Sequence, residues 1–229
     1  ETLKKYFIEE TYEVLEAIDL KSPEKLCEEL GDVLLQVIFH ARIAEENGQF
    51  TMDDVIDTVS RKMVHRHQHV FGLAQAETAD DVVNLWEDIK KQEKGVKSQT
   101  EVLKDVPPVL PALMRSYKVQ EKAAKVGFDW DHVEDAWKKV AEETEELREA
   151  YLTGDKEKTE GEMGDLLFAV VNVARFLKIQ PELALTGTIN KFIRRFEYIE
   201  TKSREKGRKL SSMTLREMDV LWDEAKKSE

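Results

Sequence analysis

The sequence has little of what stabilises a secreted protein or anchors a protein in a membrane. Its 229 residues include one cysteine, Cys27, so no disulfide can form within the chain. No uncharged apolar run reaches the roughly 18 residues that a membrane-spanning helix requires. These two absences favour a cytoplasmic protein with no membrane partner.

Glycine and proline are also scarce, and positive charge is in deficit. Ten glycines and five prolines beside 36% charged residues indicate long helices. The net charge of −12 repels phosphate backbones, which argues against nucleic acid as the main partner. Since no segment shows the strict alternation of a β-strand, we expect an all-α protein.

The most informative feature that is present is an internal repeat. A shift of 133 residues places the segment 9–42 on the segment 142–175 without a gap. Acids on a solvated helix surface can be exchanged freely, so their retention in both copies indicates a preserved carboxylate cluster. The retained positions include Glu9, Glu10, Thr11, Glu13, Glu16, Ala17, Glu29, Gly31, Asp32, Ala41 and Arg42.

The repeat predicts two tandem helical-bundle units, at 1–94 and 112–229, joined by a linker at 95–111 that contains three prolines. Cap residues, among them Ser22 before a proline, Thr51 and Asp155, delimit the helices within each unit together with apolar spacing. The expected helices are 2–18, 23–46, 51–67, 78–94, 112–126, 132–152, 155–177, 181–206 and 214–227. The first copy lacks the helix that precedes the acidic motif in the second, so we expect further residues before Glu1.

The repeated acids are spaced for one helix face. Glu143 and Glu146 are three residues apart, as are Glu162 and Asp165 on the next helix. An apolar run follows Asp165, and another follows its counterpart in the first copy, which predicts helices buried on nearly all sides. Carboxylates beside an apolar core need a proton or a cation, and oxygen ligands favour a hard ion such as Mg²⁺ or Mn²⁺.

Basic and aromatic residues recur as well. The corresponding pairs are Lys62 and Lys191, Arg66 and Arg195, Trp86 and Trp222, and Lys90 and Lys226. Lysine and arginine neutralise phosphate oxygens, and tryptophan offers a stacking face for a base. Each residue alone could equally be a solvated charge or a core anchor, but recurrence in both copies favours a nucleotide site. The alternating His65, His67 and His69 point in different directions on a helix, so we do not expect them to share a metal unless the helix ends there.

The order Glu-Glu-x-x-Glu, spacer, Glu-x-x-Asp resembles the signature of the all-α nucleoside triphosphate pyrophosphohydrolases, and its duplication resembles the MazG family. The segments 110–115, 126–130 and 194–196 are similar to that family as well. The resemblance implies a Mg²⁺-dependent homodimer that cleaves nucleoside triphosphates between the α and β phosphates, commonly as a house-cleaning activity. The products would be a nucleoside monophosphate and pyrophosphate.

The resemblance also implies a role for each matching position. The implied metal ligands are Glu143, Glu146, Glu162 and Asp165 in the second copy, and Glu10, Glu13, Glu29 and Asp32 in the first. The implied nucleotide contacts are Lys139, Glu142, Lys191, Arg195, Trp222 and Lys226, with Lys62, Arg66, Trp86 and Lys90 in the first copy. The four ligands of the second copy and Glu142 form the expected catalytic set, in which Glu142, like Glu9, is a candidate for orienting the attacking water.

We expect the second copy to be the catalytic one, as is general in the family. The first copy has Gln68 where His-Pro-His is expected, yet its set of metal ligands is intact. The sequence is therefore compatible with an active, a weakened or a regulatory first site.

Two other functions fit the composition. A non-enzymatic helical adaptor or regulatory protein would simply solvate the acids, and Mg²⁺ would not stabilise it. A di-metal oxidase would use Glu-x-x-His pairs, and no glutamate in this chain has a histidine three residues later.

Overall fold

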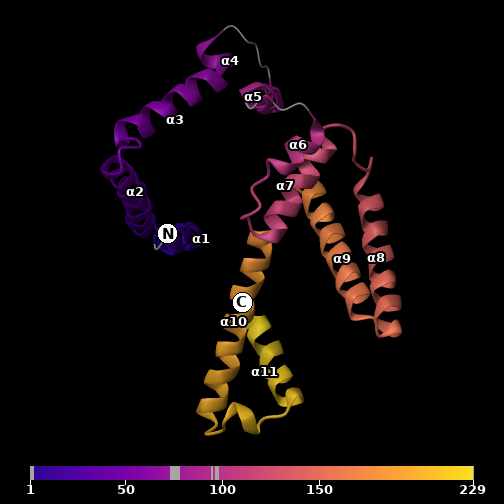
Figure 1. The fold of residues 1–229 in the computed structure, drawn as a ribbon. Helices are drawn as coiled ribbons and strands as arrows, with labels where there is room; N and C mark the ends of the chain where they lie inside the picture. Colours follow the sequence, from indigo (N-terminus) through magenta and orange to yellow (C-terminus); the bar gives the residue numbers. More distant parts are fainter. Residues whose placement is uncertain (1–2, 73–77, 94, 96–97, 229) are drawn as a thin grey trace. The chain divides into compact units, whose positions relative to one another are not determined.

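The computed structural model describes residues 3–72, 78–93, 95 and 98–228. Every regular element in this part of the chain is helical (Figure 1), which confirms the all-α prediction. No helix found there is long and apolar enough to cross a membrane. The chain divides into two compact units, Glu1–Gly95 and Val96–Glu229.

Unit 1 is built on a helical hairpin. Its helices are α1 (Lys4–Asp19), α2 (Pro23–Glu46), α3 (Met52–Arg66), α4 (Gln68–Phe71) and α5 (Ala79–Glu93). α1 packs along α2, and α3 contacts both α2 and α5. As predicted, α2 begins at a serine cap followed by proline, because the Ser22 side chain accepts the Lys25 N–H at 3.3 Å. A capping box between Thr51 and Asp54 begins α3, whereas the short α4 was not predicted.

Unit 2 begins earlier than expected, because the segment 95–111 contains α6 (Gln99–Lys104). The Ser98 side chain caps this helix, and Val102 and Val106 beside it are buried. α6 also contacts α7, so this segment is part of the packed unit as well as a connection. The prolines that suggested a linker all follow α6. The remaining elements are α7 (Ala112–Ala124), α8 (Val133–Thr153), α9 (Lys156–Phe176), α10 (Pro181–Glu205), the 3₁₀ turn η1 (Leu210–Ser212) and α11 (Leu215–Ser228).

Two hairpins, α8–α9 and α10–α11, make up most of unit 2, and α7 contacts α9 and α10 (Figure 1). α8 ends at Gly154 in the left-handed conformation, with φ 73°, and Asp155 then caps α9. The buried Gln120 of α7 donates a hydrogen bond to the carbonyl of Phe168 at 2.8 Å. The tight connection therefore makes α8 and α9 antiparallel neighbours, which places their two acidic motifs together.

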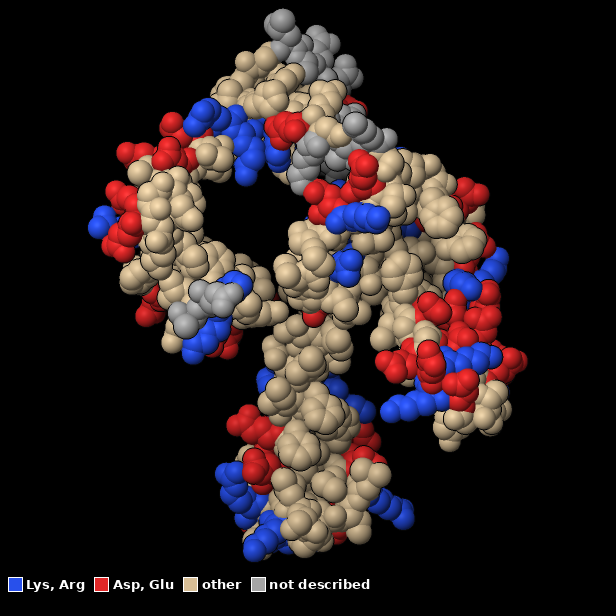
Figure 2. Space-filling view, in the orientation of Figure 1, with Lys and Arg blue, Asp and Glu red and all other residues tan. Residues whose placement is uncertain are grey.

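One expectation about burial is wrong. α2 and α9 are not buried on nearly all sides, because the neighbouring helices of their own unit cover only part of each surface. Leu34 is 53% exposed, Leu167 is 50% exposed and Phe168 is 44% exposed. α10 also exposes large apolar side chains, and Figure 2 shows a broad uncharged surface along this helix. Acidic side chains gather instead over α8 and α9. The hairpins thus expose large apolar side chains.

Candidate metal centre and nucleotide site

The α8–α9 hairpin brings the acids of the second copy together. Oxygens of Glu142, Glu143 and Glu146 lie within 4.8 Å of one another. Oxygens of Glu143, Glu162 and Asp165 form a second group within the same limit. Glu143 belongs to both groups and is buried, whereas Asp165 is exposed, so the acids extend from the packed seam of the hairpin to its surface.

The charges of this cluster are partly compensated within the chain. A hydrogen bond that protonated Glu146 donates to Glu143 raises the pKa of Glu146, and burial and the charge of Glu143 raise it further. The ammonium of Lys139 lies 2.7 Å from Glu142 and 2.7 Å from Glu143, and these two contacts raise the lysine pKa. The site therefore requires positive charge, and it offers only oxygen ligands. Both properties fit a hard divalent ion.

The first copy gathers a smaller set of acids on α1 and α2. Oxygens of Glu10, Glu13 and Glu29 lie within 4.8 Å of one another. Burial and then the charge of Glu13 raise the pKa of Glu10 and of the buried Glu29. Asp32 is not a member of this group, although its charge also raises both pKa values.

The two copies also differ at the lysine. The shift of 133 residues pairs Lys139 with Tyr6, so the first copy lacks the ammonium that neutralises Glu142 and Glu143 in the second. Under the same shift the acids themselves are identical. In the first copy the nearby cation is instead Lys25, which pairs with Glu16 at 2.5 Å and whose charge opposes the rise in the pKa of Glu29. The two copies therefore differ in which lysine accompanies the acids, a difference that the acidic motif alone does not reveal.

Two of the nucleotide-binding candidates of the second copy, Lys139 and Glu142, lie on α8 beside the acids, and the other four lie on the hairpin α10–α11. The guanidinium of Arg195 is 5.5 Å from the centre of the Trp222 ring, and Phe192 contacts the same indole at 5.1 Å. Lys191 is half-buried, one turn before Arg195. Lys226 pairs with Asp223 at 3.0 Å. The structure thus brings together an arginine and an aromatic face, on a hairpin distinct from the one that carries the acids.

In unit 1 one of the corresponding basic residues pairs with Glu93, a residue that the sequence motifs did not indicate. The guanidinium of Arg66 lies 4.9 Å from the centre of the Trp86 ring, and the Lys90 ammonium lies 5.6 Å from it. Arg66 also forms an ion pair of 2.5 Å with Glu93, which lowers the pKa of that carboxyl, as does the more distant charge of Lys62. The only sequence signal for Glu93 is its place one turn after Lys90.

None of the candidate metal groups among the described residues contains His65, His67 or His69, and α3 ends at Arg66, between the first two of them. His65 lies 3.7 Å from Glu93, and the rings of His67 and His69 are 5.7 Å apart. In the part of the chain that the structure describes, the candidate metal groups consist of glutamate and aspartate alone.

Comparison with known proteins gives consistent matches. The MazG nucleotide pyrophosphohydrolase domain matches residues 1–71 and 132–199, and each segment contains one copy of the acidic motif. The chain is 45% identical over 226 residues to the nucleoside triphosphate pyrophosphohydrolase/pyrophosphatase MazG of Thermotoga maritima, covering 99% of this chain and 86% of that protein. It is 42% identical over 232 residues to the nucleoside triphosphate pyrophosphohydrolase of Escherichia coli K12, covering 100% of this chain and 88% of that protein. It is 53% identical over 230 residues to the uncharacterized protein YabN of Bacillus subtilis, of which it spans 47%.

Proposed function

Because the chain belongs to the MazG nucleotide pyrophosphohydrolase family, we propose that it hydrolyses nucleoside triphosphates between the α and β phosphates. The products are a nucleoside monophosphate and pyrophosphate. One observation supports this most strongly: Glu143 lies within 4.8 Å of Glu146 in one group and of Glu162 and Asp165 in another. This set comes from two neighbouring helices and recurs in part in the first unit.

The proposed cofactor is Mg²⁺, held by Glu143, Glu146, Glu162 and Asp165. The fit rests on the all-oxygen donors, on their mutual distances and on the raised pKa of Glu146. When bound, Mg²⁺ neutralises phosphate charge and lowers the pKa of a coordinated water.

The chain's own residues supply the remaining functions. Lys139 keeps its charge at neutral pH, because its carboxylate partners raise its pKa. Its ammonium group can exchange these carboxylates for a phosphate oxygen of the substrate. Glu142, once released from Lys139, is an exposed carboxylate beside the metal ligands that can accept the proton of the attacking water. Lys191 and Arg195, on α10, then neutralise phosphates, Trp222 stacks on the base, and Lys226, one turn after Trp222 on α11, contacts the same nucleotide.

The active form is a homodimer. α9 and α10 carry large side chains that are about half exposed, among them Leu167 at 50%, Ile189 at 50% and Ile193 at 57%. A second copy that covers these faces buries apolar surface that the single chain leaves in water. Association also allows the acids of one hairpin and the cations of another to face one triphosphate.

The second copy is the main catalytic site, because all four of its metal ligands belong to the grouped acids, whereas Asp32 of the first copy does not. The test compares two double variants. We expect Glu146→Gln with Asp165→Asn to abolish pyrophosphate release from ATP and Mg²⁺, because two of the four ligands lose their charge. We expect the matched pair Glu13→Gln with Asp32→Asn to retain most of the rate. The reverse result would transfer the activity to the first copy and reject the assignment.

A further inference from the structure

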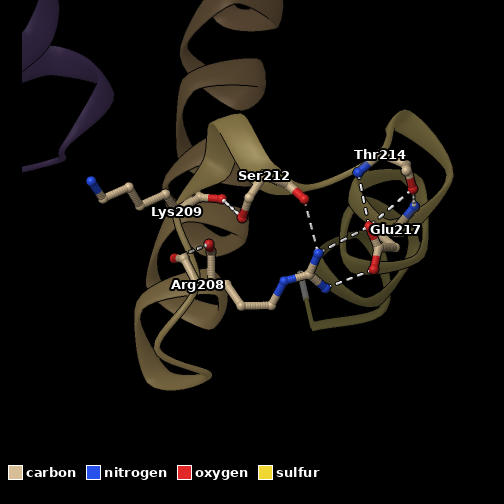
Figure 3. Close-up of polar contacts among 6 residues, drawn as sticks. Arg208, Lys209, Ser212, Thr214 and Glu217 are labelled. Carbon is tan, nitrogen blue, oxygen red and sulfur yellow. Dashed lines mark hydrogen bonds and ion pairs between the residues drawn. The ribbon is translucent and has the colours of Figure 1, made fainter.

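The turn between α10 and α11 contains a polar network that includes none of the proposed site residues (Figure 3). Arg208 donates from one terminal nitrogen to Glu217 at 2.6 Å, and from the other to the Ser212 carbonyl at 3.0 Å. The buried hydroxyl of Ser203, on α10, donates to the carbonyl of Arg208 at 2.7 Å. One arginine therefore connects the end of α10, the intervening turn and the beginning of α11.

Glu217 has two functions in this network. Besides accepting from Arg208, its carboxylate accepts the Thr214 N–H at 2.8 Å and the Thr214 hydroxyl at 3.0 Å, which caps the first turn of α11. The bonds from Arg208 and then from Thr214 lower the pKa of Glu217 to about 2, so the carboxylate is charged at any practical assay pH. The helix cap and the arginine contact thus share a single side chain.

The network lies at the base of the hairpin that carries Trp222. This tryptophan is five residues after Glu217 on the same helix, or about 8 Å along its axis. A change of about 10° in the direction of α11 at the turn would move the indole by about 1.4 Å relative to α10. Such a displacement changes the contacts that the Trp222 indole makes with Arg195 and Phe192, which both lie on α10.

The first copy provides a comparison within the same chain. It keeps the cap, because Thr78 and Asp81 form the same pair of reciprocal bonds at 2.9 Å and 3.2 Å. Six residues before Thr78, however, stands Gly72, whereas six residues before Thr214 stands Arg208. Helix capping therefore does not require this arginine, which is present only in the copy that we assign to catalysis.

We infer that Arg208 and Glu217 are positioning residues that hold Trp222 in the orientation in which it stacks on the base. The inference rests on the proposed function of the second copy. Both side chains are 41% exposed, and exposed ion pairs contribute little to stability, so the pair acts mainly on geometry. Its removal weakens the binding of substrates that carry a base, while the phosphate-binding residues of α10 stay in place.

The test is a steady-state measurement of pyrophosphate release from ATP and Mg²⁺ by the full chain. We expect Arg208→Met to raise KM about tenfold with kcat within about twofold, because misplacement of about 1 Å weakens binding. We expect the inhibition constant of inorganic tripolyphosphate, which has no base to stack, to change less than twofold. Arg208→Lys should recover part of the affinity. Glu217→Gln keeps an oxygen for the helix cap, so it should reproduce the KM effect and add little to Arg208→Met in the double variant.

Arg204→Met is the matched control, since Arg204 lies in the last turn of α10, four residues before Arg208, and forms a surface ion pair with Glu200 at 3.3 Å. An unchanged KM in Arg208→Met would overturn the inference. It would also be overturned if tripolyphosphate binding weakened in parallel, or if Arg204→Met had the same effect, since both indicate general loss of structure. Absence of pyrophosphate release by the unaltered protein would instead reject the proposed function.

Discussion

The proposed dimer makes a quantitative prediction for the apolar face of α10. Ile193 is 57% exposed, and Ile189 and Phe196, one turn before and after it, are 50% and 42% exposed. Burial of a whole isoleucine side chain contributes about 1.5–3 kcal/mol, so covering the exposed part of Ile193 contributes about 1–1.7 kcal/mol per copy. Each contact occurs twice in a symmetric dimer, which gives about 2–3 kcal/mol.

Ile193→Glu removes this contribution and places a carboxylate on the same face of each copy. Burial of an unpaired charge costs several kcal/mol more, so the total loss exceeds about 4 kcal/mol. Since about 1.4 kcal/mol corresponds to a tenfold change in Kd, we expect dimer dissociation to increase by about a thousandfold or more. The single chain should keep its fold, because Ile193 is already exposed there.

The assay is sedimentation velocity across micromolar concentrations, together with circular dichroism and pyrophosphate release. We expect a monomer with unchanged helix content and greatly reduced activity. Thr201→Glu places the same charge at an exposed polar position of α10 and should remain dimeric. A dimeric and fully active Ile193→Glu variant, or a monomeric unaltered protein with full activity, would refute the reasoning.

The remaining predictions concern the metal centre. Mg²⁺ at about 100 times its Kd should stabilise the protein by about 2.7 kcal/mol in chemical denaturation, and Glu146→Gln with Asp165→Asn should remove this effect; equal stabilisation of both proteins would contradict the ligand assignment. The pKa of Glu146 is raised above its ordinary value of 4.5, so without Mg²⁺ its contribution to stability is present below pH 4.5 and is lost as pH rises through the raised value. Thermal unfolding from pH 4 to 8 should therefore show this loss, and the loss should be smaller in Glu146→Gln or with Mg²⁺; identical profiles would count against the raised pKa of Glu146.

The helices were largely predictable because their ends depend on local chemistry. Ser22, Thr51 and Asp155 cap their helices as expected, since a cap needs only its own side chain and the next few backbone amides. The short helices α4 and α6 were not predicted, because four and six residues are too few to show a helical period.

The site was predictable only in part. The spacing of three residues was enough to bring Glu143 and Glu146 together, and the repeat suggested the neighbouring helix. The exposure of α9 could not be predicted, because an apolar run indicates a need for burial but not which surface provides it. Pairs such as Arg66 with Glu93 and Arg208 with Glu217 depend on how a turn bends, and charged residues are too frequent in this sequence for spacing to identify them.

The central claim is that the grouped carboxylates of α8 and α9 serve cleavage between the α and β phosphates. The most direct measurement is product analysis by phosphorus NMR after incubation of the unaltered protein with ATP and Mg²⁺. We predict AMP and pyrophosphate, and no product when Glu146→Gln and Asp165→Asn are combined. ADP and orthophosphate, or no cleavage of any nucleoside triphosphate by the unaltered protein, would contradict the claim.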